Sequence, residues 1–233
     1  MNNIVSMIDH AVLQPTQNDA DVRDACKLCD ELKVASICVK PSQVPLARIE
    51  LRDSPVLVST VIGFPHGGTS TTTKVAETIE ACSLGAREVD MVVNLGKVYS
   101  GDWDYVLADI RAVVEAAAEH ESITKVIFET GLLDDPQKIK LCELSEEAKA
   151  AFVKTSTGFG YKKNADGQLV GTGATTADVA LMRKHTSDAL QVKASGGVRN
   201  FADALKFVEL GATRLGTSST AAIAAGASAD SDY

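Results

Sequence analysis

The sequence predicts one α/β domain, a (β/α)₈ or TIM barrel over residues 1–225, followed by a flexible C-terminal tail at 226–233. Three observations support this. Short β-branched segments alternate with longer amphipathic segments, there are about eight such pairs, and 233 residues suit a barrel of about 250. No linker or shift in composition marks a second domain. An open doubly wound sheet is the alternative topology.

The predicted strands are rich in β-branched and aromatic residues and end at turn-forming ones. In chain order they are Val5–Asp9, Ala35–Lys40, Val56–Ile62, Glu88–Val93, Lys125–Glu129, Phe152–Thr155, Gln191–Ala194 and Arg214–Gly216. The helical segments between them carry apolar residues three and four positions apart. They are 19–32, 71–85, 102–120, 135–150, 175–186 and 201–211, and two of them close on a glycine, a common helix-ending residue. The segment 160–173 has neither pattern and is expected to be a loop.

Charge and composition restrict the classes of partner. The formal net charge is −8, which argues against a nucleic acid or an anionic membrane as partner. No apolar run approaches the ~20 residues of a membrane span, and the start lacks a basic region before an apolar core. We therefore expect a cytoplasmic protein. The five cysteines suit a reducing compartment, and Cys26 and Cys29 lie within a predicted helix rather than at a metal or redox motif.

Two lysines end consecutive predicted strands, where a barrel carries its active site. Lys154 precedes Thr-Ser-Thr-Gly and Lys193 precedes Ala-Ser-Gly-Gly. Strands ~4.8 Å apart would bring the two ammonium groups to roughly 5 Å. At an effective dielectric of ~20 they repel by about 3 kcal/mol, enough to lower one lysine's pKa by ~2 units. Such a lysine attacks aldehydes and ketones. The alternative is two unrelated lysines whose ammonium groups reach solvent.

Further charged residues on other predicted strands complete this candidate site. Asp90 can balance the charge of two amines and relay protons through water, or it can form a purely structural salt bridge. Lys125 either adds a further positive charge or pairs with Glu129. Asp9 ends the first predicted strand and belongs at the same barrel mouth.

Two glycine-containing loops predict a phosphate site. Ser195-Gly196-Gly197 follows the seventh strand, and 216–219 follows the eighth and opens a helix. Exposed backbone N–H groups and a helix N-terminus at these positions are the usual phosphate site of a barrel. Gly171-x-Gly173 follows a loop and is interpreted as the start of a helix, not as a dinucleotide motif. The histidines lack metal-ligand spacing, so we expect no metal and no cofactor.

The motifs in their order resemble the 2-deoxyribose-5-phosphate aldolase family. The segments are VIGFPHG, EVDMVVNLG, KVIFETGLL, FVKTSTGFG, VKASGGVR and GATRLGTSS, and the resemblance runs from about Ile8 to Ile223. It implies a lyase that reversibly cleaves 2-deoxy-D-ribose 5-phosphate to acetaldehyde and D-glyceraldehyde 3-phosphate through a lysine Schiff base. It also implies a phosphosugar and an aldehyde as substrates, a place in deoxyribose phosphate catabolism, and a homodimer as a common assembly.

The resemblance also assigns roles. Lys154 would form the Schiff base, Lys193 would lower its pKa, and Asp90 would act as acid and base through water. Tyr233, the last residue, would reach the site and assist proton transfer. The substrate and its phosphate would be held by Asp9, Lys125, Thr157, Gly158, Gly196, Gly197, Gly216, Ser218 and Ser219.

The chain departs from common family patterns around the mouth. Ala11 and Gln14 replace a threonine and a lysine, Lys40 replaces an asparagine, and the loop 161–171 is longer than the shortest versions. These departures leave alternatives: a Schiff-base barrel lyase acting on another phosphorylated aldehyde, a non-catalytic phosphosugar-binding barrel, or an isomerase with Asp90 as base.

Overall fold

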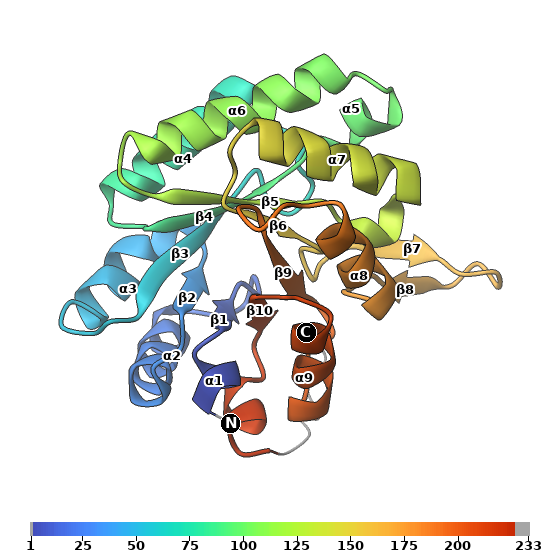
Figure 1. The fold of residues 1–233 in the computed structure, drawn as a ribbon. Coiled ribbons are helices and arrows are strands. Elements are labelled where there is room, and N and C mark those ends of the chain that lie inside the picture. Colours follow the sequence, from blue (N-terminus) through green and yellow to red (C-terminus); the bar gives the residue numbers. More distant parts are fainter. Residues whose placement is uncertain (1, 227–233) are drawn as a thin grey trace.

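Eight parallel strands close into a barrel in the order β1–β10–β9–β6–β5–β4–β3–β2 in the computed structural model, which describes residues 2–226 (Figure 1). Their bounds are β1 Ile8–Val12, β2 Ser36–Val39, β3 Leu57–Ile62, β4 Glu88–Val92, β5 Ile123–Ile127, β6 Phe152–Lys154, β9 Gln191–Ser195 and β10 Arg214–Thr217. The predicted barrel is confirmed, and the closed order excludes an open doubly wound sheet.

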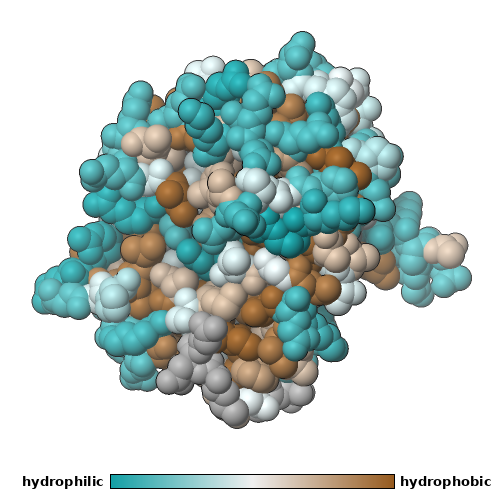
Figure 2. Space-filling view, viewed as in Figure 1, coloured by the Kyte–Doolittle hydropathy of each residue, from teal (hydrophilic) through white to brown (hydrophobic). Residues whose placement is uncertain are grey.

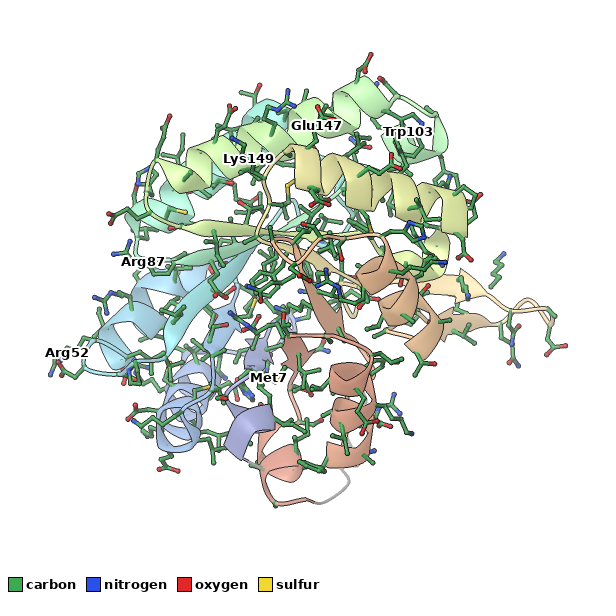
Figure 3. The ribbon with its side chains drawn as sticks, viewed as in Figure 1. Met7, Arg52, Arg87, Trp103, Glu147 and Lys149 are labelled. Carbon is green, nitrogen blue, oxygen red and sulfur yellow. The ribbon has the colours of Figure 1, made fainter. Side chains whose placement is uncertain are left out.

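Helices surround this barrel as an outer layer (Figure 1). The longer ones are α2 Asp19–Leu32, α3 Val44–Glu50, α4 Thr71–Ser83, α6 Trp103–Ala118, α7 Asp135–Glu147, α8 Thr176–Lys184 and α9 Phe201–Glu209. Short helices are α1 Asn2–Val5, α5 Leu95–Tyr99 and α10 Thr220–Ala224. Charged side chains such as Arg52, Glu147 and Lys149 point outward from this layer (Figure 3). Within residues 2–226, no helix has the length and apolar character needed to cross a membrane.

Local sequence explains where several helices begin. Asn18 caps α2, and its side chain and that of Asp21 satisfy each other's backbone N–H groups. Asp134 and Gln137 form the same reciprocal arrangement at α7. Cys26 and Cys29 lie on the buried face of α2, and all five cysteines are free and buried, as expected of structural thiols.

Two predicted strands have the wrong bounds. β1 is Ile8–Val12, not Val5–Asp9, because its pairing with β10 starts at Ile8 and its pairing with β2 runs to Val12, and residues 2–5 form α1. β5 covers Ile123–Ile127, not 125–129, because Glu129 has a φ of +58°, outside the extended region that a strand requires. The ends of the other six strands differ from the prediction by at most one residue.

The segment 160–173 is not an irregular loop. It forms an antiparallel hairpin of β7 (Tyr161–Lys163) and β8 (Leu169–Gly171), separate from the barrel sheet. Gly167, with a φ of +79°, sits in the connecting turn. The hairpin projects from the molecule and is mostly hydrophilic on the face seen in Figure 2. Gly171 ends β8 and α8 starts only at Thr176, so Gly171-x-Gly173 precedes the helix without opening it.

Strand alternation separates the apolar core from the polar interior of the barrel. On β4, Val89 and Met91 belong to the main hydrophobic cluster, which fills the space between strands and helices. Glu88 and Asp90, at the alternate positions, point into the barrel and meet charged side chains from other strands. The same alternation on other strands directs further charged side chains into the barrel.

Candidate active site

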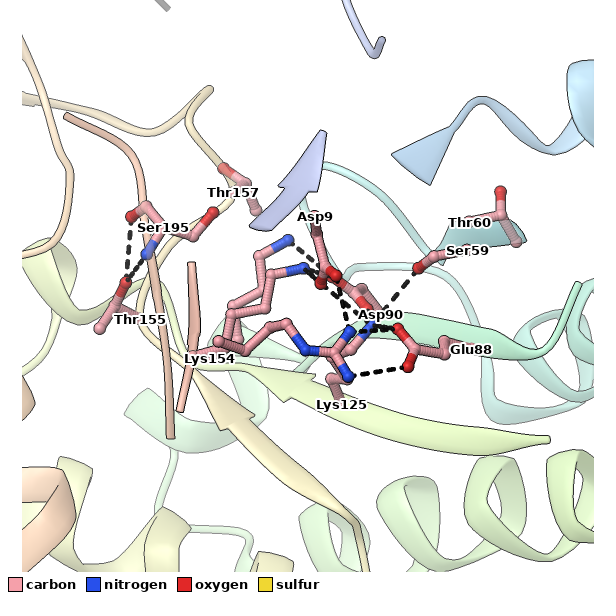
Figure 4. Close-up of polar contacts among 12 residues, drawn as sticks. Asp9, Ser59, Thr60, Glu88, Asp90, Lys125, Lys154, Thr155, Thr157 and Ser195 are labelled. Carbon is pink, nitrogen blue, oxygen red and sulfur yellow. Dashed lines mark hydrogen bonds and ion pairs between the residues drawn. The ribbon is translucent and has the colours of Figure 1, made fainter. Parts of the chain in front are cut away.

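Seven charged side chains from six strands meet inside the barrel (Figure 4). They are Asp9 on β1, Glu88 and Asp90 on β4, Lys125 on β5, Lys154 on β6, Lys193 on β9 and Arg214 on β10. Six of these side chains are at most 2% exposed, and Arg214 is 14% exposed. We call these seven residues the charged cluster.

The two lysines singled out in the sequence lie directly opposite each other on neighbouring strands. Lys154 is in register with Lys193. The Nζ atoms of Lys154 and Lys193 are 2.9 Å and 2.8 Å from the same oxygen of Asp90, Oδ2. Asp90 therefore lies between the two amines, as the charge argument from the sequence anticipated.

The two lysines differ in how many carboxylates surround them. Among the described residues, Lys154 pairs with Asp90 alone, whereas Lys193 also contacts Asp9 at 2.5 Å. Burial lowers the pKa of Lys154, and the charge of Lys193 lowers it further against the pull of Asp90. Burial also opposes the charge of Lys193, but Asp9 and Asp90 raise the pKa of Lys193 above its ordinary value. Of the two amines, Lys154 is thus the one that loses its proton more readily.

Lys125 lies within the charged cluster and not at the glycine loops. Its Nζ is 2.6 Å from Glu88, 2.7 Å from Asp90 and 3.4 Å from Asp9. Although burial opposes its charge, these carboxylates raise the pKa of Lys125 above its ordinary value. Of the two alternatives for Lys125, the structure shows the added positive charge and not a pair with Glu129.

Glu129 instead joins the loop after β6 to the β7–β8 hairpin. It accepts hydrogen bonds from the backbone N–H of Thr157 at 3.1 Å, from the Thr157 hydroxyl, and from the Thr172 hydroxyl at 2.9 Å. The hydroxyl of Thr157, expected to face substrate, is therefore directed to Glu129.

Glycines with positive φ shape the loops after β6 and β9. Gly158, Gly196 and Gly197 have φ values of +86°, +83° and +81°, a conformation that side chains disfavour. Gly158 and Gly197 come together on one cavity of about 370 Å³. Its other lining residues are Gln14, Phe159, Tyr161, Gly171, Thr172, Gly173 and Arg199. Two of the predicted phosphate-binding glycines thus share a cavity.

β10 packs closely against β9 and the loop that follows it. A Cβ atom at Gly216 would lie 2.5 Å from the hydroxyl oxygen of Ser195, so only glycine fits there. The Thr217 hydroxyl donates to the carbonyl oxygen of Val198 at 2.6 Å and joins the end of β10 to the loop after β9. Ser218 and Ser219 follow at the turn into α10, as predicted, but neither they nor Gly196 and Gly216 are among the described residues lining the cavity of Gly158.

The departures from family patterns occupy defined places. Ala11 is buried in a small apolar cluster with Leu13, Cys38 and Val61, next to the charged cluster. Lys40 donates from Nζ to the backbone carbonyl oxygens of two loop residues, at 3.1 Å and 2.6 Å, and so holds the loop after β1.

Tyr233 and the tail from residue 227 lie outside the described residues. Within residues 2–226, no group of three or more histidine, cysteine or acidic side chains is arranged to hold a metal ion.

Glu88 and Arg214 belong to the charged cluster but were not predicted from the sequence. The Nη1 atom of Arg214 is 2.6 Å from Asp9 and 2.8 Å from Glu88, and Nη2 is 3.1 Å from the second oxygen of Glu88. Each stands two residues before a residue already singled out, Asp90 and Gly216. Because side chains alternate along a strand, that spacing was an available signal that both point into the barrel.

Comparisons with known proteins agree with this geometry. The DeoC/LacD aldolase family matches residues 4–228. A deoxyribose-phosphate aldolase of Carboxydothermus hydrogenoformans is 48% identical over 232 residues, covering 99% of this chain and 97% of that protein. One from Clostridium perfringens is 45% identical over 230 residues, covering 99% and 98%. A structure of the tetrameric deoxyribose phosphate aldolase from Aeropyrum pernix aligns with a TM-score of 0.85 at 29% identity, covering 95% of this chain and 89% of that one. The chain belongs to the DeoC/LacD family of aldolases.

Proposed function

We propose that this protein is a deoxyribose-phosphate aldolase, which reversibly cleaves 2-deoxy-D-ribose 5-phosphate to acetaldehyde and D-glyceraldehyde 3-phosphate. The observation that carries the proposal is one buried amine, Lys154, with a lowered pKa, held beside Asp90 and Lys193. The curated relatives named above bear the same activity in their names. An isomerase using Asp90 as base would not need the paired lysines.

The reaction begins when the neutral amine of Lys154 adds to the C1 aldehyde of the open-chain sugar. Loss of water from the adduct gives an iminium ion, whose positive charge draws the electrons of the C2–C3 bond. The C3 hydroxyl gives its proton through water to Asp90 as that bond breaks, and D-glyceraldehyde 3-phosphate leaves. The remaining enamine is protonated at C2, and addition of water releases acetaldehyde and the free lysine.

Lys193 and Asp90 have different roles in this scheme. Lys193 keeps its charge because it contacts two carboxylates, so it favours an uncharged Lys154 by repulsion. Asp90, with an oxygen shared by both amines, is the group that can exchange a proton with the reacting oxygen. Both roles are inferred from the Asp90 oxygen that Lys193 shares with the reacting amine of Lys154.

The phosphate is assigned to the loops after β6, β9 and β10. Gly158 and Gly197 border one cavity, and the positive φ of both exposes backbone N–H groups without a side chain in the way. Because the molecule carries a net charge of −8, a phosphate must be held by such local donors. Direct substrate contacts of Asp9, Lys125, Thr157 and the serines, proton transfer by Tyr233, a cytoplasmic location and a homodimer stay predictions.

Borohydride trapping tests the proposal. The protein is incubated with acetaldehyde, reduced and digested, and the peptides are weighed. We expect an ethyl group on the Lys154 peptide, its loss in Lys154→Met, and no adduct at the exposed Lys149, an internal control.

A coupled assay for glyceraldehyde 3-phosphate then identifies the substrate. An adduct at Lys154 without release of this product from deoxyribose 5-phosphate would indicate a Schiff-base lyase of another aldehyde. An adduct on no lysine would reject covalent catalysis altogether.

A further inference from the structure

The charged cluster contains one more cation than carboxylate. Its acidic members are Asp9, Glu88 and Asp90, and its basic members are Lys125, Lys154, Lys193 and Arg214. The other polar or titratable groups facing it are neutral: the Ser36 hydroxyl on β2 donates to Asp9 at 2.7 Å, Lys125 is 3.4 Å from the Ser59 hydroxyl on β3, and Cys38 on β2 is fully buried beside the lysines. With every basic member protonated, the cluster would hold an unbalanced positive charge.

Charge balance decides which cation gives up its proton. An uncompensated charge at a buried site is costly, so the neutral arrangement of three cations and three carboxylates is favoured. Lys125, Lys193 and Arg214 each contact at least two carboxylates, whereas Lys154 contacts Asp90 alone among the described residues. Lys154 is therefore the surplus cation.

Arg214 is a member of this balance that does not touch the reacting amine among the described residues. It lies two residues before Gly216 on β10, and no contact joins it to Lys154 among the described residues. Its guanidinium binds Glu88 through both Nη atoms, contacts Asp9, and lies 5.0 Å from the centre of the Phe152 ring. A guanidinium keeps its charge at any pH an enzyme meets, so Arg214 is a permanent positive charge in the cluster.

We propose that Arg214, through Asp9 and Glu88, is a positioning residue that keeps Lys154 uncharged. Its permanent charge occupies carboxylate oxygens that would otherwise stabilise a protonated Lys154. The inference rests on the proposed function, because it takes Lys154 as the nucleophile. It goes beyond a role for Lys193 alone, because it assigns part of the control of the Lys154 charge to a second ion pair, Arg214 with Glu88.

Substitutions of Arg214 and of Glu88 should shift the pH at which Lys154 loses its proton in opposite directions. A purely structural role for the two residues would not produce opposite shifts. Arg214→Met leaves three carboxylates with two fixed cations, so Lys154 keeps its proton to higher pH. Glu88→Gln leaves two carboxylates against three cations, so Lys154 loses its proton at lower pH. The double variant restores balance at two against two, and Arg214→Lys preserves it.

The test measures the rate of reductive ethylation of Lys154 by acetaldehyde and cyanoborohydride as a function of pH, read from the peptide mass. Only the neutral amine reacts, so the pH of half-maximal rate follows the pKa of Lys154. We expect this pH to rise by about one unit or more in Arg214→Met, to fall in Glu88→Gln, and to return near wild type in the double variant and in Arg214→Lys.

The outcomes separate this inference from the proposed function. Wild-type protein without an adduct at Lys154 rejects the proposed function and the inference with it. A wild-type adduct combined with unshifted profiles, or with shifts of the same sign in both single variants, overturns the inference alone. Should Arg214→Met fail to fold, Glu88→Gln still decides the matter, because it keeps every cation and predicts a shift to lower pH.

Discussion

His10 shows how a single position on a strand determines a residue's chemistry. It follows Asp9 on β1 and therefore points away from the charged cluster, toward α10. There its Nδ1 atom is 2.8 Å from the Thr220 hydroxyl, and burial lowers its pKa to about 4. The two neighbours thus differ in charge: Asp9 is ionised among cations, whereas His10 is buried beside a hydroxyl and neutral.

The depressed pKa of His10 makes stability depend on pH. The unfolded chain binds a proton on this histidine near pH 6.5 and the folded protein only near 4, so the unfolded state holds more protons between these values. The contribution of His10 to stability should therefore fall by about 3 kcal/mol as pH drops through this window, and no further below it. Urea unfolding of wild type and His10→Gln at several pH values checks this. An equal decline in both proteins would contradict it.

The β7–β8 hairpin contributes to the wall of the cavity beside Gly158. Glu129 holds its C-terminal base through Thr172, and a Cβ atom at Gly160 would lie 2.6 Å from the Glu129 carboxylate carbon. The backbone N–H of Thr172 also donates to the carbonyl oxygen of Gly160 at 2.8 Å. Tyr161 and Gly171, the paired ends of the hairpin, both line the cavity. The hairpin base is therefore part of the cavity wall.

Weakening this attachment should affect substrate binding more than chemistry. Glu129→Gln replaces a carboxylate by a group with a single acceptor oxygen, so one of the three hydrogen bonds to neutral donors must change. A lost hydrogen bond to a charged group, about 1.5–3 kcal/mol, predicts a rise in KM for deoxyribose 5-phosphate of about tenfold or more, with kcat nearly kept. Steady-state kinetics beside the exposed control Glu119→Gln measure this. A fall in kcat at unchanged KM would refute the assignment.

At the scale of the whole molecule, a buried ion pair joins the helical layer to the barrel. The Nζ atom of Lys74 on α4 is 2.5 Å from Asp109 on α6 and 2.9 Å from the backbone carbonyl oxygen of Val92 at the end of β4. Both side chains are at most 2% exposed. Two helices and one strand are thus held together by one ammonium group.

Breaking this pair should destabilise the whole fold. Lys74→Met leaves Asp109 buried without its cation, which costs about 3–5 kcal/mol, whereas Lys74→Met with Asp109→Leu removes both charges and should recover much of that loss. Lys27→Met, which breaks an exposed pair with Asp24, should change stability by less than about 1 kcal/mol. Urea unfolding of the four proteins compares them. A double variant no more stable than Lys74→Met would show that the packing, and not the charge, matters.

Local signals predicted most of the fold. Runs of β-branched residues located the eight strands, which are buried on both faces, and apolar residues three and four positions apart located most of the main helices, which bury one face. They failed at Val5 and Glu129, where strand limits depend on which residues a neighbouring strand pairs, and at 161–171, where polar residues form a hairpin. Register and hairpin pairing are contacts between distant residues, so no local pattern contains them.

The sequence by itself determined that two lysines and an aspartate lie on barrel strands and that glycine-containing loops follow two of the strands. Only the tertiary structure decided which lysine carries the lower pKa, that Lys125 belongs to the charged cluster, and that Glu88 and Arg214 complete it. The reason is physical: a side chain's ionisation depends on the number and distance of charges brought around it by other strands. Closure of the barrel places each of those charges within 4 Å of an opposite charge.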